Sequence, residues 1–129
     1  MYITTKGPAM ATAKRFTDLI VWQKAHVLVQ DVYSIATLFP RDEVYCLTAQ
    51  LKRAIISVPA NIAEGFTRTS NHEKIRFYNI AQASLEESRY FLILAHDLHF
   101  TDTSQILIQL TEVARILESY KNAVPRPKR

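Results

Sequence analysis

The most informative segment of this 129-residue chain is Ser57-Val58-Pro59-Ala60-Asn61-Ile62-Ala63-Glu64-Gly65. Its apolar residues recur at three- and four-residue steps, as they do on the buried face of a helix. A proline inside a helix removes one backbone hydrogen bond and bends the axis. A buried asparagine or glutamate costs about 1–3 kcal/mol unless it finds a partner. The segment therefore predicts a helix closely fitted to its neighbours, in a protein that works by assembly and binding.

The composition favours a single helical domain. Hydrophobic residues make up 48% of the chain, enough for one core, and the two glycines leave few positions for tight turns. Cys46 is the sole cysteine, so a disulfide framework is excluded and a reducing cytoplasm is the expected compartment. The longest apolar run, Tyr90 to Ala95, has six residues, far below the ~20 of a membrane span. We expect no membrane association.

Apolar periodicity predicts four helices. The first covers about residues 18–38, and we expect one apolar stripe of it to face inward: Leu19, Trp22, His26, Val29, Tyr33 and Ala36. The second covers about residues 43–68, with Pro59 as the expected kink and Gly65 near its end. The third begins at Ser70-Asn71-His72-Glu73, which has the S-x-x-E form of a capping box, and runs to about Leu98. The fourth follows Asp102 and has its own inward stripe: Ile106, Leu110, Val113, Leu117 and Tyr120.

The short connections predict an all-α fold, an antiparallel up-down-up-down four-helix bundle. We expect three parts: a flexible basic N-terminal lead at residues 1–17, the bundle at residues 18–122, and a basic C-terminal tail at residues 123–129. This topology places both termini and the connection between the second and third helices at the same end of the bundle.

The formal charge of +4 is unevenly distributed. Residues 1–17 and 121–129 hold seven of the sixteen basic residues and no acid, whereas residues 18–120 have a net charge of −3. A basic end with flexible tails and two helix N-termini is suited to phosphates. The candidate nucleic-acid contacts are Lys14, Arg15, Arg68, Lys74, Arg76, Lys121, Arg126, Lys128 and Arg129. No groove-reading motif is present, so binding should depend on backbone or shape. The alternative is that the tails only keep the protein in solution.

A polar stripe follows the predicted second helix, and a comparable polar pair lies on the third. The stripe consists of Ser57, Asn61, Glu64 and Arg68, and the pair of Ser84 and Glu87. We hypothesise that Asn61 and Glu64 hydrogen-bond across this seam and fix the helix register, with Arg53 or Arg68 as the countercharge. The alternative is an exposed polar face.

Several segments resemble a known family, the bacterial four-helix-bundle proteins encoded in intervening sequences of 23S ribosomal RNA genes. The resemblance spans roughly Phe16 to Tyr120, and its carriers are residues 16–25, Phe39-Pro40, residues 50–54, residues 57–65 and residues 83–87. The family is similar in fold to the accessory variability protein of diversity-generating retroelements, a pentameric ring that binds nucleic acid and a reverse transcriptase. The resemblance implies a homopentamer and, more weakly, binding of RNA or DNA.

No catalytic residue, metal site or cofactor is predicted. A paired-metal bundle needs an E-x-x-H motif, and no glutamate has a histidine three positions on. The enzyme alternative is a ribonuclease of the HEPN type, because Arg89 and His96 fit its R-x(4–6)-H pattern. The six residues between them, 90–95, are apolar and suit a buried wall better than an open cleft.

The resulting expectation is a non-enzymatic, self-assembling bundle. Its basic end binds structured nucleic acid without sequence specificity, or binds a partner that handles nucleic acid. The main alternative is a protein–protein scaffold without a nucleic-acid role.

Overall fold

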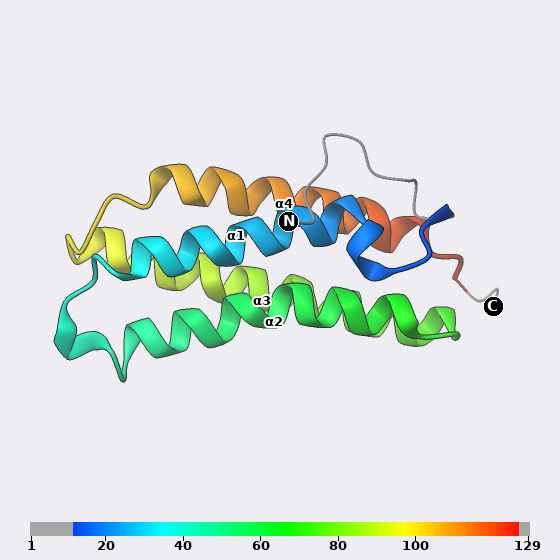
Figure 1. The fold of residues 1–129 in the computed structure, drawn as a ribbon, viewed down its shortest axis with the longest axis horizontal. Helices are drawn as coiled ribbons and strands as arrows, with labels where there is room; N and C mark the ends of the chain where they lie inside the picture. Colours follow the sequence, from blue (N-terminus) through cyan, green and yellow to red (C-terminus); the bar gives the residue numbers. More distant parts are fainter. Residues whose placement is uncertain (1–11, 127–129) are drawn as a thin grey trace.

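The computed structural model describes residues 12–126 and confirms the all-α prediction. Its four helices lie side by side and alternate in direction (Figure 1). Their bounds are Ile20–Ala36 for α1, Leu47–Thr67 for α2, Asn71–Asp97 for α3 and Ser104–Ala123 for α4. Two short 3-10 helices precede α1 and α2, namely η2 at Phe16–Asp18 and η3 at Arg41–Glu43. None of the described helices is both long and apolar enough to cross a membrane.

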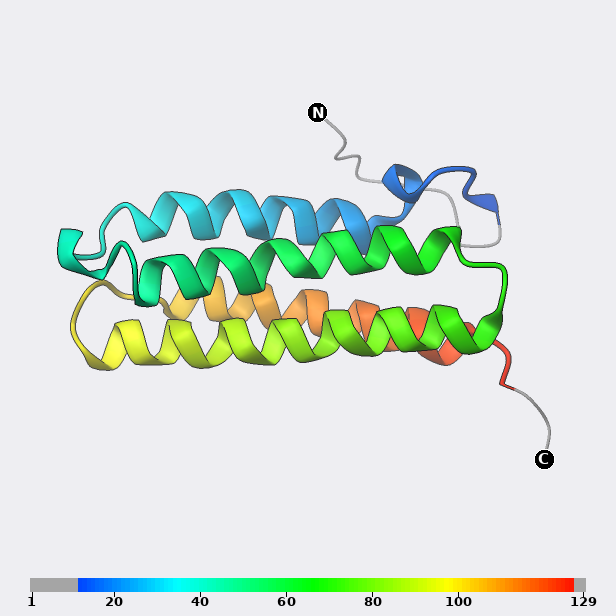
Figure 2. The same cartoon turned by 90° about the horizontal axis from the view of Figure 1, so that it is seen from below.

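The connections alternate between the two ends of the bundle (Figure 2). The α1–α2 and α3–α4 connections lie at one end, while η2, the α2–α3 connection and the end of α4 lie at the other. Going round the bundle, α1 packs against α2 and α4, and α3 also packs against α2 and α4. The expected topology is therefore confirmed for the described residues.

The second helix begins later than the sequence predicts. The chain makes the 3-10 turn η3 at Arg41–Glu43, and α2 starts only at Leu47. The Glu43 carboxylate accepts a hydrogen bond from the backbone N–H of Leu47, with 3.3 Å between Oε1 and N. Glu43 thus satisfies a free donor at the helix N-terminus instead of forming its first turn. From Leu47 the helix continues through the buried Pro59 to Thr67.

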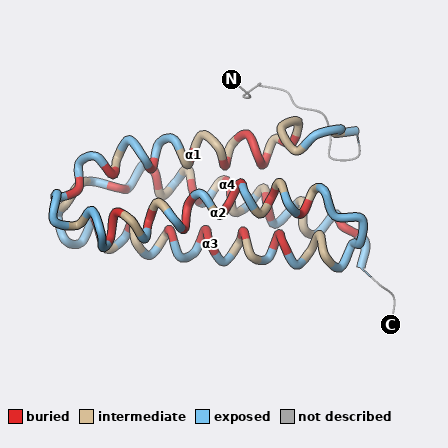
Figure 3. The backbone as a smooth tube through the Cα atoms, turned by 60° about the horizontal axis from the view of Figure 1, so that its bottom comes forward, coloured by how far each residue is buried: buried red, intermediate tan, exposed pale blue. Residues whose placement is uncertain are grey.

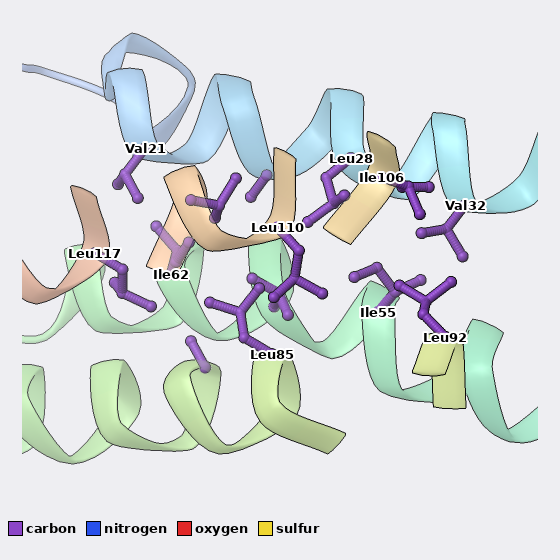
Figure 4. Close-up of a cluster of buried hydrophobic side chains, with 14 of the residues drawn as sticks. Val21, Leu28, Val32, Ile55, Ile62, Leu85, Leu92, Ile106, Leu110 and Leu117 are labelled. Carbon is purple, nitrogen blue, oxygen red and sulfur yellow. The ribbon is translucent and has the colours of Figure 1, made fainter. Parts of the chain in front are cut away.

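The core runs along the whole axis of the bundle, and buried positions face inward on every helix (Figure 3). Leucine, isoleucine and valine side chains from all four helices meet there (Figure 4). The inward stripe expected for α1 is wrong in part, because Tyr33 is exposed and Val21, Leu28 and Val32 are fully buried instead. The helix carries two adjacent apolar stripes, one that includes Tyr33 and one that includes Val32, and they are about 100° apart around the helix axis. The apolar spacing in the sequence does not decide which of the two stripes faces the core.

Two features delimit α3. Ser70 is its N-cap, and the Ser70 hydroxyl accepts a hydrogen bond from the backbone N–H of Glu73 at 3.3 Å, as the S-x-x-E pattern predicts. At the other end, His99 has a φ of 63°. The N–H of Phe100 donates to the carbonyl of Ala95, and that of His99 donates to the carbonyl of His96. This is a Schellman motif with histidine at the position that glycine usually occupies.

The wall expected at residues 90–95 is only partly buried. Leu92 and Ala95 are fully buried, whereas Tyr90 and Ile93 are exposed. Six consecutive apolar residues wrap around a helix in less than two turns, so some of them must point away from the core.

The seam between α2 and α3 is held by short side chains. The hydroxyl oxygens of Ser57 and Ser84 lie 2.8 Å apart, within hydrogen-bond distance across the two helices. The Asn61 amide donates to the carbonyl and hydroxyl of Ser57 at 2.8 and 2.9 Å, within its own helix. The Ser88 hydroxyl donates to the carbonyl of Ser84.

The register hypothesis is therefore corrected in its details. Asn61 reaches the seam only through Ser57, and the exposed Glu64 pairs with Arg68 on its own helix. Arg53 and Glu87 are both exposed on the outer surface. Two serine hydroxyls, and not the Asn61 and Glu64 side chains, therefore make the contact across this seam.

Candidate nucleic-acid interface

The predicted basic residues that the structure describes gather at one end of the bundle. Lys14 and Arg15 precede η2, Arg68 is the C-cap of α2, and Arg126 follows α4. The N-termini of α1 and α3 are at this end as well (Figures 1 and 2). Lys128 and Arg129 lie outside the described residues. We call this end, defined by Lys14, Arg15, Arg68, Lys74, Arg76, Lys121 and Arg126, the basic end.

Two arginines share one aromatic ring at the basic end. The guanidinium carbons of Arg68 and Arg76 lie 4.7 and 4.5 Å from the centroid of the Phe77 ring. Cation–π contacts of this kind hold guanidinium groups in place while leaving donors toward solvent. The sequence analysis did not single out Phe77. Its position directly after Arg76 was a signal that an aromatic ring lies close to the basic residues.

Each of these arginines is also paired with a glutamate. Arg68 Nη2 lies 2.6 Å from Glu64 Oε2, and Arg76 donates two hydrogen bonds to Glu73 at 2.9 and 3.1 Å. The hydrogen bond from Arg76 lowers the pKa of Glu73, and the same bond raises the pKa of Arg76. These pairs reduce the net charge of the basic end, and both are exposed enough for a phosphate to compete for the arginine.

Lys74 has a structural role. Its ammonium donates to the backbone carbonyls of Gly65 and Phe66 at 3.2 and 2.8 Å, which are among the free carbonyls at the C-terminus of α2. Burial lowers the pKa of Lys74. The lysine thus ties the end of α2 to the start of α3 and has few donors left for a ligand.

Lys121 is engaged too. Its Nζ lies 3.0 Å from Glu118 Oε2, and its side chain is only 16% exposed. The pairs Glu64–Arg68, Glu73–Arg76 and Glu118–Lys121 all have the three- or four-residue spacing of neighbours on a helix. The spacing can be read from the sequence. The count of charges by segment did not consider that these cations could be paired with acids on the same helix.

Besides Lys74, which binds backbone carbonyls, three described cations of the basic end take part in no ion pair of the described residues, namely Lys14, Arg15 and Arg126. All three are exposed. The Asp18 carboxylate accepts hydrogen bonds from the backbone N–H groups of Lys14 and Arg15, at 3.1 Å each. This turn fixes the backbone of the two residues and leaves their side chains in solvent.

A cavity of about 200 Å³ opens between the α2–α3 connection and the end of α4. It is lined by Phe66, Asn71, Lys74, Tyr78, Ala123, Val124 and Pro125. Burial raises the pKa of Tyr78 to about 12.

The residues of the ribonuclease alternative are both engaged. Arg89 donates to Glu86 on its own helix and, at 2.8 Å, to the Thr111 hydroxyl of α4. His96 Nδ1 accepts from the backbone N–H of Thr103 at 3.3 Å and lies 3.6 Å from Asp102 Oδ1. Within the part of the chain that the structure describes, no three histidine, cysteine or acidic side chains are placed to hold a metal ion.

Four antiparallel helices with a cluster of cations at one end define the class: an all-α bundle protein with a positively charged end. The model of the family described as 23S rRNA-intervening sequence protein matches residues 17–119. The chain belongs to this family, as its sequence motifs predict.

A solved structure has the same fold. It is that of a protein of unknown function from the S23 ribosomal protein family of Bacteroides thetaiotaomicron. The TM-score is 0.73 at 22% sequence identity, over 80% of this chain and 99% of that one. A search of the curated proteins found no match.

Proposed function

We propose that this protein is a non-enzymatic, self-assembling bundle, a homopentamer, whose basic end binds structured RNA or DNA without sequence specificity. The observation that carries the proposal is the gathering of Arg68, Arg76, Lys14, Arg15 and Arg126 beside two helix N-termini. Helix N-termini and cations both attract phosphate groups. Self-assembly multiplies these charges, and each phosphate that is neutralised adds to the affinity at low salt.

The contacts of the cations divide them into three groups, to which we assign different roles. Lys14, Arg15 and Arg126 are exposed and outside ion pairs, so we assign them the main phosphate contacts. Arg68 and Arg76 are positioned by Phe77 and are recruited when phosphate displaces a glutamate. Lys74 and Lys121 mainly stabilise the bundle.

The test is the salt dependence of binding to a fluorescent RNA hairpin and to a DNA duplex, measured by anisotropy. Changing Lys14, Arg15 and Arg126 to glutamine should weaken binding roughly tenfold at low salt. It should also reduce the slope of log K against log salt by about 0.7–0.9 for each phosphate that the variant no longer neutralises. A control changes Arg115 to glutamine, because Arg115 is exposed, takes part in no ion pair of the described residues and lies more than two turns before the end of α4. An equal weakening in the control, or unchanged binding by the first variant, would contradict the assignment.

The second candidate is a protein–protein scaffold without nucleic-acid binding. The observation that favours it is the number of large apolar side chains at the surface, such as Tyr45, Tyr90 and Ile108. An oligomer that binds neither probe at low salt would support the scaffold over the first proposal.

The ribonuclease remains a lesser candidate. In favour of it, Arg89 and His96 lie two turns apart on α3 and so on one face of it. Cleavage of a labelled RNA that disappears in His96→Ala would establish it.

A further inference from the structure

The cavity at the basic end has the size and the lining of a site for one small ring-shaped group. Its volume of about 200 Å³ is well above the ~10–15 Å³ that one water molecule needs, and below the ~300–1,000 Å³ of pockets for drug-sized ligands. Ala123, Val124 and Pro125 give it an apolar wall from the end of α4, and Phe66 adds an aromatic ring from the end of α2. No acidic side chain is among the described residues that line it.

The Tyr78 hydroxyl at this cavity has no partner among the described residues. Tyr78 is only 1% exposed, and its hydroxyl makes no hydrogen bond with another described residue. Every fully buried side-chain nitrogen and oxygen of the described residues does have a hydrogen-bond partner, so this hydroxyl reaches open space. That space is the cavity, which Tyr78 lines. A buried hydroxyl of this kind is an unused donor, which a ligand in the cavity would satisfy.

Lys74 supplies a second donor to the same cavity. An ammonium group has three N–H donors, and the carbonyls of Gly65 and Phe66 accept two of them. Because Lys74 also lines the cavity, its third donor is left for a ligand there. Lysine can only donate, whereas a tyrosine hydroxyl can donate or accept. The ligand group that fits both side chains is therefore a hydrogen-bond acceptor, such as a carbonyl oxygen or a ring nitrogen.

The cavity lies next to cations that can hold phosphates. Arg126 directly follows Pro125 of the apolar wall, and Arg68 lies two residues after Phe66; both arginines are exposed. The end of α4 and the α2–α3 connection, which carry them, lie at the same end of the bundle (Figure 2). A phosphate fits poorly inside the cavity, because its charges would lose their hydration against apolar walls. The arrangement suits a ligand whose ring enters the cavity while its phosphates stay outside with the arginines.

An unpaired nucleobase meets all of these conditions. Its flat faces pack against aromatic and apolar side chains, and its edge carries oxygens and nitrogens that accept hydrogen bonds. It is attached to phosphates, which cations attract. A base inside a duplex does not fit, because its partner occupies its edge and the neighbouring bases cover both of its faces.

We propose that this cavity binds one unpaired base of a nucleic acid, with Tyr78 and Lys74 donating to the edge of the base and Phe66 and Val124 packing against its ring. This inference rests on the proposed binding of nucleic acid and names the part that the basic end prefers: a loop, a bulge or a single-stranded end. Binding of this kind needs no particular sequence, since every base has a flat face and an acceptor on its edge.

The test compares two fluorescent RNA hairpins of equal charge by anisotropy at low salt. One has a loop of uridines, and the other has a loop of the same length in which every nucleotide is abasic. The phosphates are the same in both, so contacts to the backbone do not distinguish them. The unchanged protein should bind the uridine-loop hairpin roughly tenfold more tightly, as expected when one base is held on an aromatic platform.

Tyr78→Phe removes the hydroxyl and keeps the ring that packs against Gly65. This variant should lose about three- to tenfold in affinity for the uridine-loop hairpin and bind the abasic hairpin as before. A preference for the uridine loop that Tyr78→Phe keeps in full would overturn the inference. So would equal binding of the two hairpins by the unchanged protein, which would leave the proposed function standing. Binding of neither hairpin would overturn the proposed function itself.

Filling the cavity gives an independent readout. Ala123→Leu extends an exposed side chain that lines the cavity, and it should abolish the preference for the uridine loop. The matched control is Asn122→Leu, because Asn122 is the exposed neighbour on α4 and is not among the residues that line the cavity. The control should keep the preference, and circular dichroism melts check that both variants are folded. An equal loss in both variants, or a full preference in Ala123→Leu, would contradict the assignment of the base to this cavity.

Discussion

Gly65 of α2 packs so closely against Tyr78 of α3 that a Cβ atom on Gly65 would lie 2.7 Å from Cε1 of the tyrosine ring. A second contact, with Cβ of Phe77, would be 3.2 Å long. Tyr78 is buried, so its ring must shift within the packed interior to admit the new atom. The glycine is therefore required by the close approach of α2 and α3 next to the basic end.

Gly65→Ala should lower the free energy of unfolding by about 1–3 kcal/mol, as overpacking usually does. At an open helical position the same substitution stabilises by up to ~1 kcal/mol, so the sign of the change is diagnostic. Urea titration followed by circular dichroism measures it. Ala60→Gly, at an exposed position of α2, should also destabilise, by about 1 kcal/mol, for want of helix propensity. A more stable Gly65→Ala variant would show that the contact is loose.

The Ser57–Ser84 pair should contribute a measurable coupling. Ser84→Ala should cost about 1 kcal/mol, since it leaves the Ser57 hydroxyl without its partner on α3. In a double-mutant cycle with Ser57→Ala, the two losses should fall short of additivity by about 0.5–1 kcal/mol. Glu64→Gln is the control, because its exposed pair with Arg68 should change stability by less than about 0.5 kcal/mol. If the losses of stability in the two single serine variants simply added in the double variant, the Ser57–Ser84 hydrogen bond would not contribute to the seam.

Stability should fall in alkaline solution because of Tyr78. Its pKa is raised to about 12 in the folded protein, against 10.0 for an ordinary tyrosine. Between these values the unfolded chain loses the phenolic proton while the folded chain keeps it, so unfolding becomes easier as the pH rises. The contribution is fully present below pH 10 and is lost toward pH 12. In melts across this range, Tyr78→Phe should show a smaller loss than the unchanged protein, and equal losses would contradict the assignment to Tyr78.

His99→Gly should stabilise the protein by about 1 kcal/mol, because His99 has a φ of 63°, which glycine adopts without the steric cost that a side chain incurs. His99→Ala separates the backbone effect from the loss of the imidazole, and should leave the melting temperature nearly unchanged. If both variants destabilised equally, the imidazole itself would be the stabilising group.

Helical periodicity predicted the four helices because each long stripe of apolar residues repeats over several turns. The S-x-x-E pattern also placed the start of α3, where the Ser70 hydroxyl and Glu73 N–H form the predicted bond. Periodicity misplaced the inward face of α1, since two adjacent stripes compete and the choice of Val32 over Tyr33 depends on the neighbouring helices. The predicted start of α2 was wrong because Glu43 precedes the helix and accepts a hydrogen bond from the backbone N–H of Leu47.

The up-and-down topology predicted which basic residues lie at the same end of the bundle. It did not predict the contacts that each of these side chains makes there. The segment charge count treated Lys74 and Arg76 as equivalent, whereas Lys74 binds backbone carbonyls and Arg76 stacks on Phe77. The carbonyls of Gly65 and Phe66 approach Lys74 only when α2 and α3 are packed together. Contacts of this kind depend on tertiary structure and leave no periodic trace in the sequence.

Assembly of this chain and binding of nucleic acid through the basic end can be measured together. Light scattering coupled to size exclusion gives the mass of the protein alone and with an RNA hairpin, at low and at moderate salt. We expect a mass near five times 14.8 kDa that rises with RNA at low salt and returns to its former value at moderate salt. A single 14.8 kDa protomer whose mass does not change with RNA at either salt would contradict it.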